Sequence, residues 1–82
     1  MRHFDDAEYG AAVRRARTEK GLSLRNVATA LGVNVALVSY VERGGEPTPE
    51  FEIAAKSKLK VDRARYQTDV RGNPLAAAAN QN

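Results

Sequence analysis

The sequence contains no cysteine, which excludes disulfide bonds and thiolate metal sites. It has one histidine, His3, which stands alone near the start of the chain, so no metal site is indicated. No long uninterrupted run of apolar residues is present, and neither a membrane span nor a signal sequence is indicated. We therefore expect no metal, no cofactor and no membrane association, and we expect the protein to be cytoplasmic.

The chain is also short, and its excess of positive charge is small. Its 82 residues suffice for one small domain with a modest core, which argues against a second domain or a self-contained catalytic cleft. No set of nucleophile, base and orienting residue can be picked out, so an enzyme is not expected. The formal net charge of +3 and the isoelectric point of about 9.6 favour polyanionic partners, although many ordinary domains share such an excess.

Apolar residues recur at helical spacing along most of the chain, which predicts an all-α domain without strands. A first helix begins at a cap formed by Asp5 or Asp6 and continues to about Lys20. Residues 63–69 are expected to form a final turn or two of helix. Residues 71–82 combine helix breakers with an alanine run, which indicates a flexible tail.

The centre of the chain predicts two short helices joined by a tight turn. The first helix, over 24–31, has a good cap in Ser23, and Gly32 can end it in a left-handed conformation at no steric cost. The second helix, over 35–43, has a good cap in Asn34. Because the connection is only a few residues long, the two helices must cross closely.

A further helix has a clear start signal after this pair. Thr48 is a good cap, Pro49 suits the first helical position, and acidic residues follow in the first turn. We expect the helix to end near Leu59 or Lys60. One of its faces carries apolar residues spaced four apart, namely Phe51, Ala55 and Leu59. This face could cover the core or bind a partner.

The central segment, GLSLRNVATALGVNVALVSYVERG, resembles the helix-turn-helix of the phage repressor and Cro family, also called the Xre type. The resemblance extends upstream to RRARTEKGLS and downstream to PTPEFEIAAKSKL, which is similar to the family's proline-containing loop and fourth helix. Glu52 and Lys56 depart from the apolar pattern of that helix. The resemblance implies that residues 1–70 form a compact DNA-binding domain of four to five helices, with the helix-turn-helix at 23–43.

The resemblance also implies how such a domain would contact DNA. The third helix enters the major groove, with its first residues and those one turn later facing base edges. The base contacts implied are Val35, Ala36, Ser39 and Tyr40. Phosphates are held at helix starts and by nearby cations. The phosphate contacts implied are Ser23, Arg25, Asn34 and Arg43. The apolar helix tip favours thymine methyl groups, with a hydrogen bond from one of the two hydroxyls.

Two structural roles follow from the same resemblance. Arg17 is placed opposite Glu42 in a partly buried ion pair that joins the first helix to the third. Family members usually bind inverted repeats as dimers, so we expect a homodimer. The dimer contacts expected are Phe51, Leu59, Val61 and Tyr66.

The function favoured is a sequence-specific transcriptional regulator, most simply a repressor that binds an inverted-repeat operator in double-stranded DNA as a dimer at the nucleoid. The alternative is a protein-binding adaptor on the same fold, which would use the apolar helix tip or the Phe51 face to hold a protein partner. Salt distinguishes the two functions, because binding through phosphates weakens steeply as salt rises and an apolar protein contact barely responds.

Overall fold

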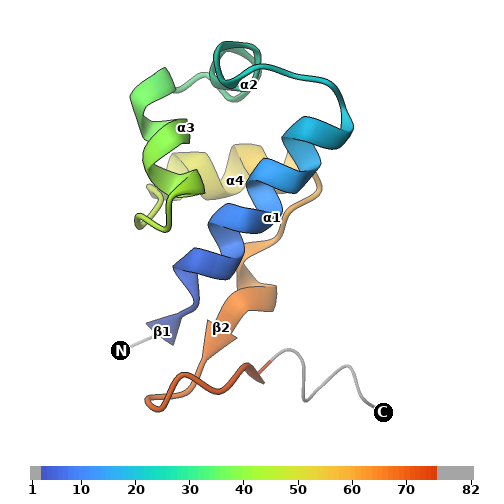
Figure 1. Cartoon of the computed structure of the whole chain (residues 1–82). Helices are drawn as coiled ribbons and strands as arrows, with labels where there is room; N and C mark the ends of the chain where they lie inside the picture. The colour runs from blue at the N-terminus through green and yellow to red at the C-terminus, as the bar shows by residue number, and fades with distance from the viewer. Residues whose placement is uncertain (1–2, 76–82) are drawn as a thin grey trace.

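Four α-helices and two short strands make up the part of the chain that the computed structural model describes, residues 3–75 (Figure 1). Along the chain the elements are β1 (His3–Phe4), α1 (Asp6–Glu19), α2 (Leu24–Leu31), α3 (Val35–Glu42), α4 (Pro49–Lys58), the 3-10 helix η1 (Arg63–Tyr66) and β2 (Gln67–Thr68). In Figure 1, α2 lies towards the C-terminal end of α1, and the two strands lie at its N-terminal end. The predicted compact domain of four to five helices is confirmed.

The prediction that the domain has no strands is wrong. β1 and β2 form an antiparallel pair in which Phe4 faces Gln67, and the next amide, of Asp5, donates to the Tyr66 carbonyl oxygen at 2.8 Å. The final helix predicted over 63–69 is instead the 3-10 helix η1, which gives way to β2 because the chain extends there to pair with β1. Strands of two residues are too short to leave an alternating pattern in the sequence.

Side-chain caps fix the starts of the four α-helices. An oxygen of each capping side chain accepts a hydrogen bond from a first-turn amide, and the caps are Asp5, Ser23, Asn34 and Thr48. The first cap is therefore Asp5 rather than Asp6. The last of these helices ends at Lys58, with Leu59 as its C-cap, close to the predicted end.

The turn between α2 and α3 depends on Gly32. This residue has a φ of 69°, in the left-handed region that favours glycine. The Val33 amide donates to the Ala28 carbonyl oxygen at 2.9 Å and the Gly32 amide donates to the Thr29 carbonyl oxygen at 3.2 Å, which is a Schellman motif. The chain therefore leaves α2 abruptly, and α3 runs at 111° to it. Within the described residues, no single helix is long and apolar enough to cross a membrane, and by length and composition only this bent pair taken together would qualify.

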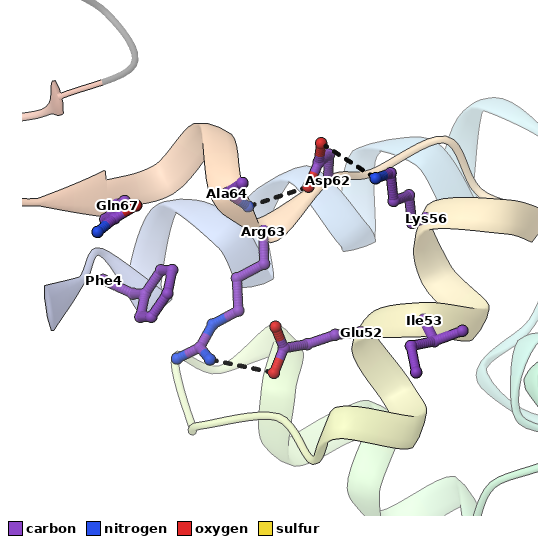
Figure 2. A pocket seen from close by; sticks show the side chains of 8 residues that line it. All are labelled: Phe4, Glu52, Ile53, Lys56, Asp62, Arg63, Ala64 and Gln67. Carbon is purple, nitrogen blue, oxygen red and sulfur yellow. Dashed lines mark hydrogen bonds and ion pairs between the residues drawn. The ribbon is translucent and has the colours of Figure 1, made fainter. Parts of the chain in front are cut away.

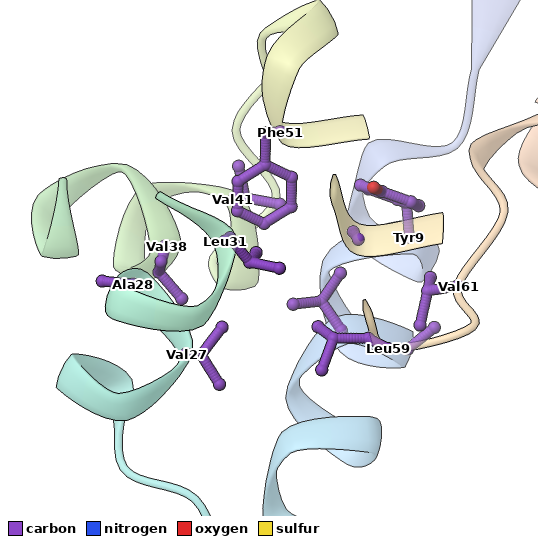
Figure 3. Close-up of a cluster of buried hydrophobic side chains, with 12 residues drawn as sticks. Tyr9, Val27, Ala28, Leu31, Val38, Val41, Phe51, Leu59 and Val61 are labelled. Atoms are coloured by element: carbon purple, nitrogen blue, oxygen red, sulfur yellow. The ribbon is translucent and has the colours of Figure 1, made fainter. Parts of the chain in front are cut away.

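Residues from all four α-helices meet in one hydrophobic core (Figure 3). The largest fully buried side chains are Tyr9, Val13, Val27, Val38, Val41 and Phe51. The apolar face predicted on α4 belongs to this core, because Phe51 and Ala55 are 0% exposed and Leu59 is 5% exposed. That face is therefore not available to a partner.

α1 and α3 approach each other closely at Gly10. A Cβ atom at this position would collide with the Val41 carbonyl oxygen and would lie 3.1 Å from the Val41 carbonyl carbon. Glycine inside a helix is unfavourable by itself, so its presence here is explained by the close approach of the two backbones.

A hydrogen-bonded turn follows β2. The Asp69 carboxylate accepts hydrogen bonds from the Asn73 amide at 2.9 Å and the Arg71 amide at 2.8 Å. These bonds, above all that from the Asn73 amide, hold the pKa of Asp69 below its usual range. Residues 71–74, at the start of the predicted tail, take part in this turn or in the bridge that joins Pro74 to Thr68. Residues 76–82 of that tail lie outside the described residues.

Candidate nucleic-acid interface

α3 buries one side in the core and leaves the other at the surface. The inward side carries two fully buried valines, Val38 and Val41. The residues predicted to contact bases are exposed or half-buried, and they are Val35, Ala36, Ser39 and Tyr40. Val35 is 41% exposed and Tyr40 is 51% exposed, so large groups project from this outward side.

The start of α2 leaves two backbone donors unused. Ser23 Oγ accepts from the Asn26 amide and Asn26 Oδ1 accepts from the Ser23 amide, both at 3.0 Å, in a capping box. The next two amides, of Leu24 and Arg25, donate to no acceptor within the described part of the chain. Because helix starts also carry a partial positive charge, this end of α2 is suited to an anion.

The two ends of α3 add further donors. Asn34 Oδ1 accepts from the Ala36 amide at 2.7 Å, and this residue is exposed. Arg43 is the C-cap of α3 and is exposed. The residues predicted to contact phosphates are all exposed, and they are Ser23, Arg25, Asn34 and Arg43.

Arg17 fixes the position of α3 relative to α1 and to the turn before α2. Its Nε donates to Glu42 Oε2 at 2.7 Å, its Nη2 donates to Glu42 Oε1 at 3.1 Å, and its Nη1 donates to the Leu22 carbonyl oxygen at 2.9 Å. The two side chains are 13% and 7% exposed. The hydrogen bond to Glu42 raises the pKa of Arg17 above its ordinary value. The structure thus contains the ion pair that the resemblance implied.

A second arginine cluster, centred on Arg63, gave no comparable signal in the sequence. Arg63 Nη2 donates to Asp6 Oδ1 at 2.8 Å. Its Nη1 donates to Glu52 Oε2 at 3.2 Å, and the guanidinium lies 3.9 Å from the centre of the Phe4 ring; Figure 2 shows Arg63 with Glu52 and Phe4. The side chain is only 10% exposed. Glu52 was the available hint, because it departs from the apolar pattern of the family's fourth helix, and the structure pairs it with Arg63.

Three of the four predicted dimer contacts belong to the core, and the prediction is wrong for them. Phe51 is 0% exposed, Leu59 is 5% exposed and Val61 is 7% exposed, so these side chains cannot reach a second copy. Lys60 has a φ of 61°, and this turn brings the chain back so that Val61 covers the core. A domain of this size needs its large apolar groups inside. Tyr66 is half-buried and packs against the same core.

This architecture defines a class of protein. It is a small helical domain in which two short helices are joined by a sharp turn, the first has unused backbone donors at its start, and the second leaves one face exposed. The family model of a helix-turn-helix domain matches residues 8–65. The chain therefore belongs to the helix-turn-helix family, of the phage repressor and Cro type, whose members bind DNA and are generally not enzymes.

The chain is also similar to a solved structure, the restriction-modification controller protein C.AhdI from Aeromonas hydrophila. The TM-score is 0.63 and the sequence identity is 28%, over 72% of this chain and 91% of that chain. A comparison with curated proteins gives no match.

Proposed function

We propose that the protein is a sequence-specific DNA-binding transcriptional regulator, most simply a repressor, that binds an inverted-repeat operator as a dimer with α3 in the major groove. The observation that carries the proposal is the outward side of α3, which lies at the surface, together with the unused donors at the start of α2 and the exposed Arg43 at the end of α3. The likeness to a controller protein supports a regulatory role.

The chemistry of the outward side favours a particular kind of base readout. Val35 and Ala36 have no side-chain donors or acceptors, so they contact thymine methyl groups in the major groove. The hydroxyls of Ser39 and Tyr40 donate to base edges or phosphates. Because this side of α3 lacks guanidinium and amide groups for bidentate base contacts, we expect thymine-containing half-sites, with each mismatch costing about 1–3 kcal/mol.

Phosphates are held on both sides of this readout helix. The amides of Leu24 and Arg25 and the Asn34 Nδ2 group donate to phosphate oxygens. The guanidinium groups of Arg25 and Arg43 add the charge that releases condensed counterions. Affinity therefore comes mainly from the backbone contacts, and sequence preference comes from α3.

Selection of bound duplexes from a random pool tests the function. We expect a palindromic consensus whose half-sites lie about 34 Å apart, or one helical turn. Affinity for that duplex should fall steeply with salt, and Arg43→Gln should lower the magnitude of the log–log slope by about one. Arg71→Gln, which changes an exposed arginine in the C-terminal turn, is the matched control and should leave the slope unchanged. Failure to enrich any duplex, or binding indifferent to salt, would favour the adaptor and remove the proposal.

For the dimer contact we propose a face centred on Ile53, because burial removes most of the residues first expected there. Ile53 lies on α4 and is 72% exposed. It borders a groove of about 210 Å³ (Figure 2). The other residues that line this groove are Phe4, Glu52, Lys56, Asp62, Arg63, Ala64 and Gln67.

Charge around Ile53 favours a second copy of this chain as the occupant. Lys56 Nζ lies 3.8 Å from Asp62 Oδ2, and these side chains are 69% and 37% exposed. Such an exposed pair contributes little within one copy. In a twofold dimer the Ile53 face of one copy contacts the Ile53 face of the other. Lys56 of one copy can then pair with Asp62 of the other, and both Ile53 side chains become buried.

Sedimentation of the parent protein and two variants tests this contact. Ile53→Lys should weaken dimerisation at least about tenfold, because an apolar contact is replaced by like charges facing each other. Val70→Lys is the control, since Val70 is 81% exposed but lies in the C-terminal turn, and it should dimerise as the parent does. A parent that stays monomeric at high concentration with and without operator, or an Ile53→Lys variant that dimerises normally, contradicts this contact.

A further inference from the structure

Two consecutive glycines follow α3, and they are there for different reasons. Gly44 has a φ of +100°, a backbone conformation that residues other than glycine rarely adopt. Gly45 is not among the residues with positive φ, so its backbone conformation is open to any residue. Another cause must explain the second glycine.

That cause is the Tyr40 ring. A Cβ atom at Gly45 would collide with the Tyr40 ring carbons Cδ2, Cε2 and Cζ. The Gly45 amide also donates to the Tyr40 carbonyl oxygen at 2.9 Å, so the backbone holds this glycine beside the same residue whose ring covers it. One part of the ring rests on Gly45, yet 51% of Tyr40 remains exposed.

We infer that Gly45 is a positioning residue for DNA readout: it provides the bare backbone on which the Tyr40 ring is seated, so that the hydroxyl is directed before DNA binds. The inference rests on the proposed function. A side chain that is already held in one orientation loses less freedom on binding than a mobile one. The rest of α3 does not need to move for the Tyr40 ring to be held in this orientation.

Gly45→Ala tests the inference, because the three atoms nearest to its methyl group belong to the Tyr40 side chain and not to the backbone. The ring can swing away, so the variant should fold and melt close to the parent. Its affinity for the duplex selected by the parent should fall about three- to tenfold, the range expected when one ordered side chain becomes mobile.

A double-mutant cycle isolates the ring as the cause. Tyr40→Ala should weaken binding at least as much as Gly45→Ala does. In the Tyr40→Ala background the Gly45→Ala change should alter the dissociation constant less than about twofold, because no ring remains to be displaced. If Gly45→Ala weakens DNA binding equally in the parent and in the Tyr40→Ala background, Gly45 acts through the loop and not through the ring. If Gly45→Ala binds DNA as the parent does, Gly45 has no effect on binding. Either outcome overturns the inference.

Nuclear magnetic resonance of the free protein separates this inference from the proposed function. Tyr40 ring protons should show contacts to the Gly45 Hα protons, whose ring-current shift should vanish in Tyr40→Ala. Lack of these contacts would show that the Tyr40 ring does not pack on Gly45, even if the parent binds DNA. A parent that selects no duplex refutes the proposed function, and the role in readout falls with it.

Discussion

At the residue scale, buried polar groups determine much of the local stability of this domain. Arg17 uses its guanidinium donors on Glu42 and on the Leu22 carbonyl oxygen, so little of its charge is left without a partner. Tyr9 is the opposite case, because its ring is fully buried and its hydroxyl has no hydrogen-bond partner within the described residues. An unpaired buried hydroxyl costs about 1–3 kcal/mol, and removing one partner of a buried ion pair costs about 3–5 kcal/mol because the other charge is left unpaired.

Arg17→Ala is expected to destabilise the domain by about 3 kcal/mol, because the largely buried Glu42 carboxylate loses its partner. Urea unfolding followed by circular dichroism measures the change. Arg14→Ala removes an exposed arginine from the same helix and should change stability by less than about 0.5 kcal/mol. Parent-like stability of Arg17→Ala would show that the ion pair does not hold α3 in place.

Tyr9→Phe is expected to stabilise the domain by about 1 kcal/mol. The substitution keeps the ring that packs edge-on against Phe51 and Tyr66 and removes the unpaired hydroxyl. The same urea titration measures it. A loss of stability would mean that the hydroxyl has a favourable interaction in solution.

Alkaline pH should destabilise the parent through the same residue. Burial, followed by the nearby Glu52 carboxylate, raises the pKa of Tyr9 well above its ordinary value. In the unfolded chain Tyr9 ionises near pH 10, whereas in the fold it stays protonated, so stability falls as pH rises above about 10. Tyr9→Phe should lose less stability than the parent between about pH 9 and pH 11. If the stability of the parent and of Tyr9→Phe falls equally over this pH range, ionisation of Tyr9 is not the cause.

At the scale of elements, local signals in the sequence gave the helices and non-local contacts determined how they pack. The bounds of α2 were predicted as 24–31 and are observed as Leu24–Leu31, because the Ser23 cap and the Gly32 turn act within a few residues of themselves. The crossing of α1 and α3 left no such signal. Gly10 reads as an unfavourable residue in a helix until the Val41 backbone is seen against it.

Gly10→Ala is expected to destabilise the domain by roughly 1–3 kcal/mol, because the added methyl group forces two helix backbones apart. Helix propensity alone predicts the opposite, a gain of about 1 kcal/mol. Thermal melting distinguishes the two effects by the sign of the change. A higher melting temperature would show that the helices do not approach closely at this position.

At the scale of the whole molecule, the Arg63 cluster joins segments from opposite ends of the chain. Arg63 and Asp6 are 57 residues apart in sequence, and Arg63 also reaches Glu52 and the Phe4 ring. Together with the pairing of β1 and β2, these contacts close the domain at the end opposite α2 (Figure 1). A single guanidinium that is largely buried thus pairs with two partly exposed carboxylates.

Arg63→Gln is expected to lower stability by about 2 kcal/mol, because Asp6 and Glu52 both lose a charged donor. Urea unfolding provides the measurement. Arg65→Gln, a neighbouring exposed arginine, should change stability by less than about 0.5 kcal/mol and serves as the control. Equal effects of the two variants would show that the cluster has no special role.

The sequence by itself determined the family, the helix-turn-helix and the caps of α2, α3 and α4, since each depends on residues close together in the chain. The pairing of Arg17 with Glu42 was implied by the family resemblance. Only the tertiary structure decided that Phe51, Leu59 and Val61 are inside, that Arg63 pairs with Asp6, and that the Tyr40 ring rests on Gly45. These contacts depend on which faces of packed helices meet, and apolar or charged spacing along one helix does not specify what lies opposite it.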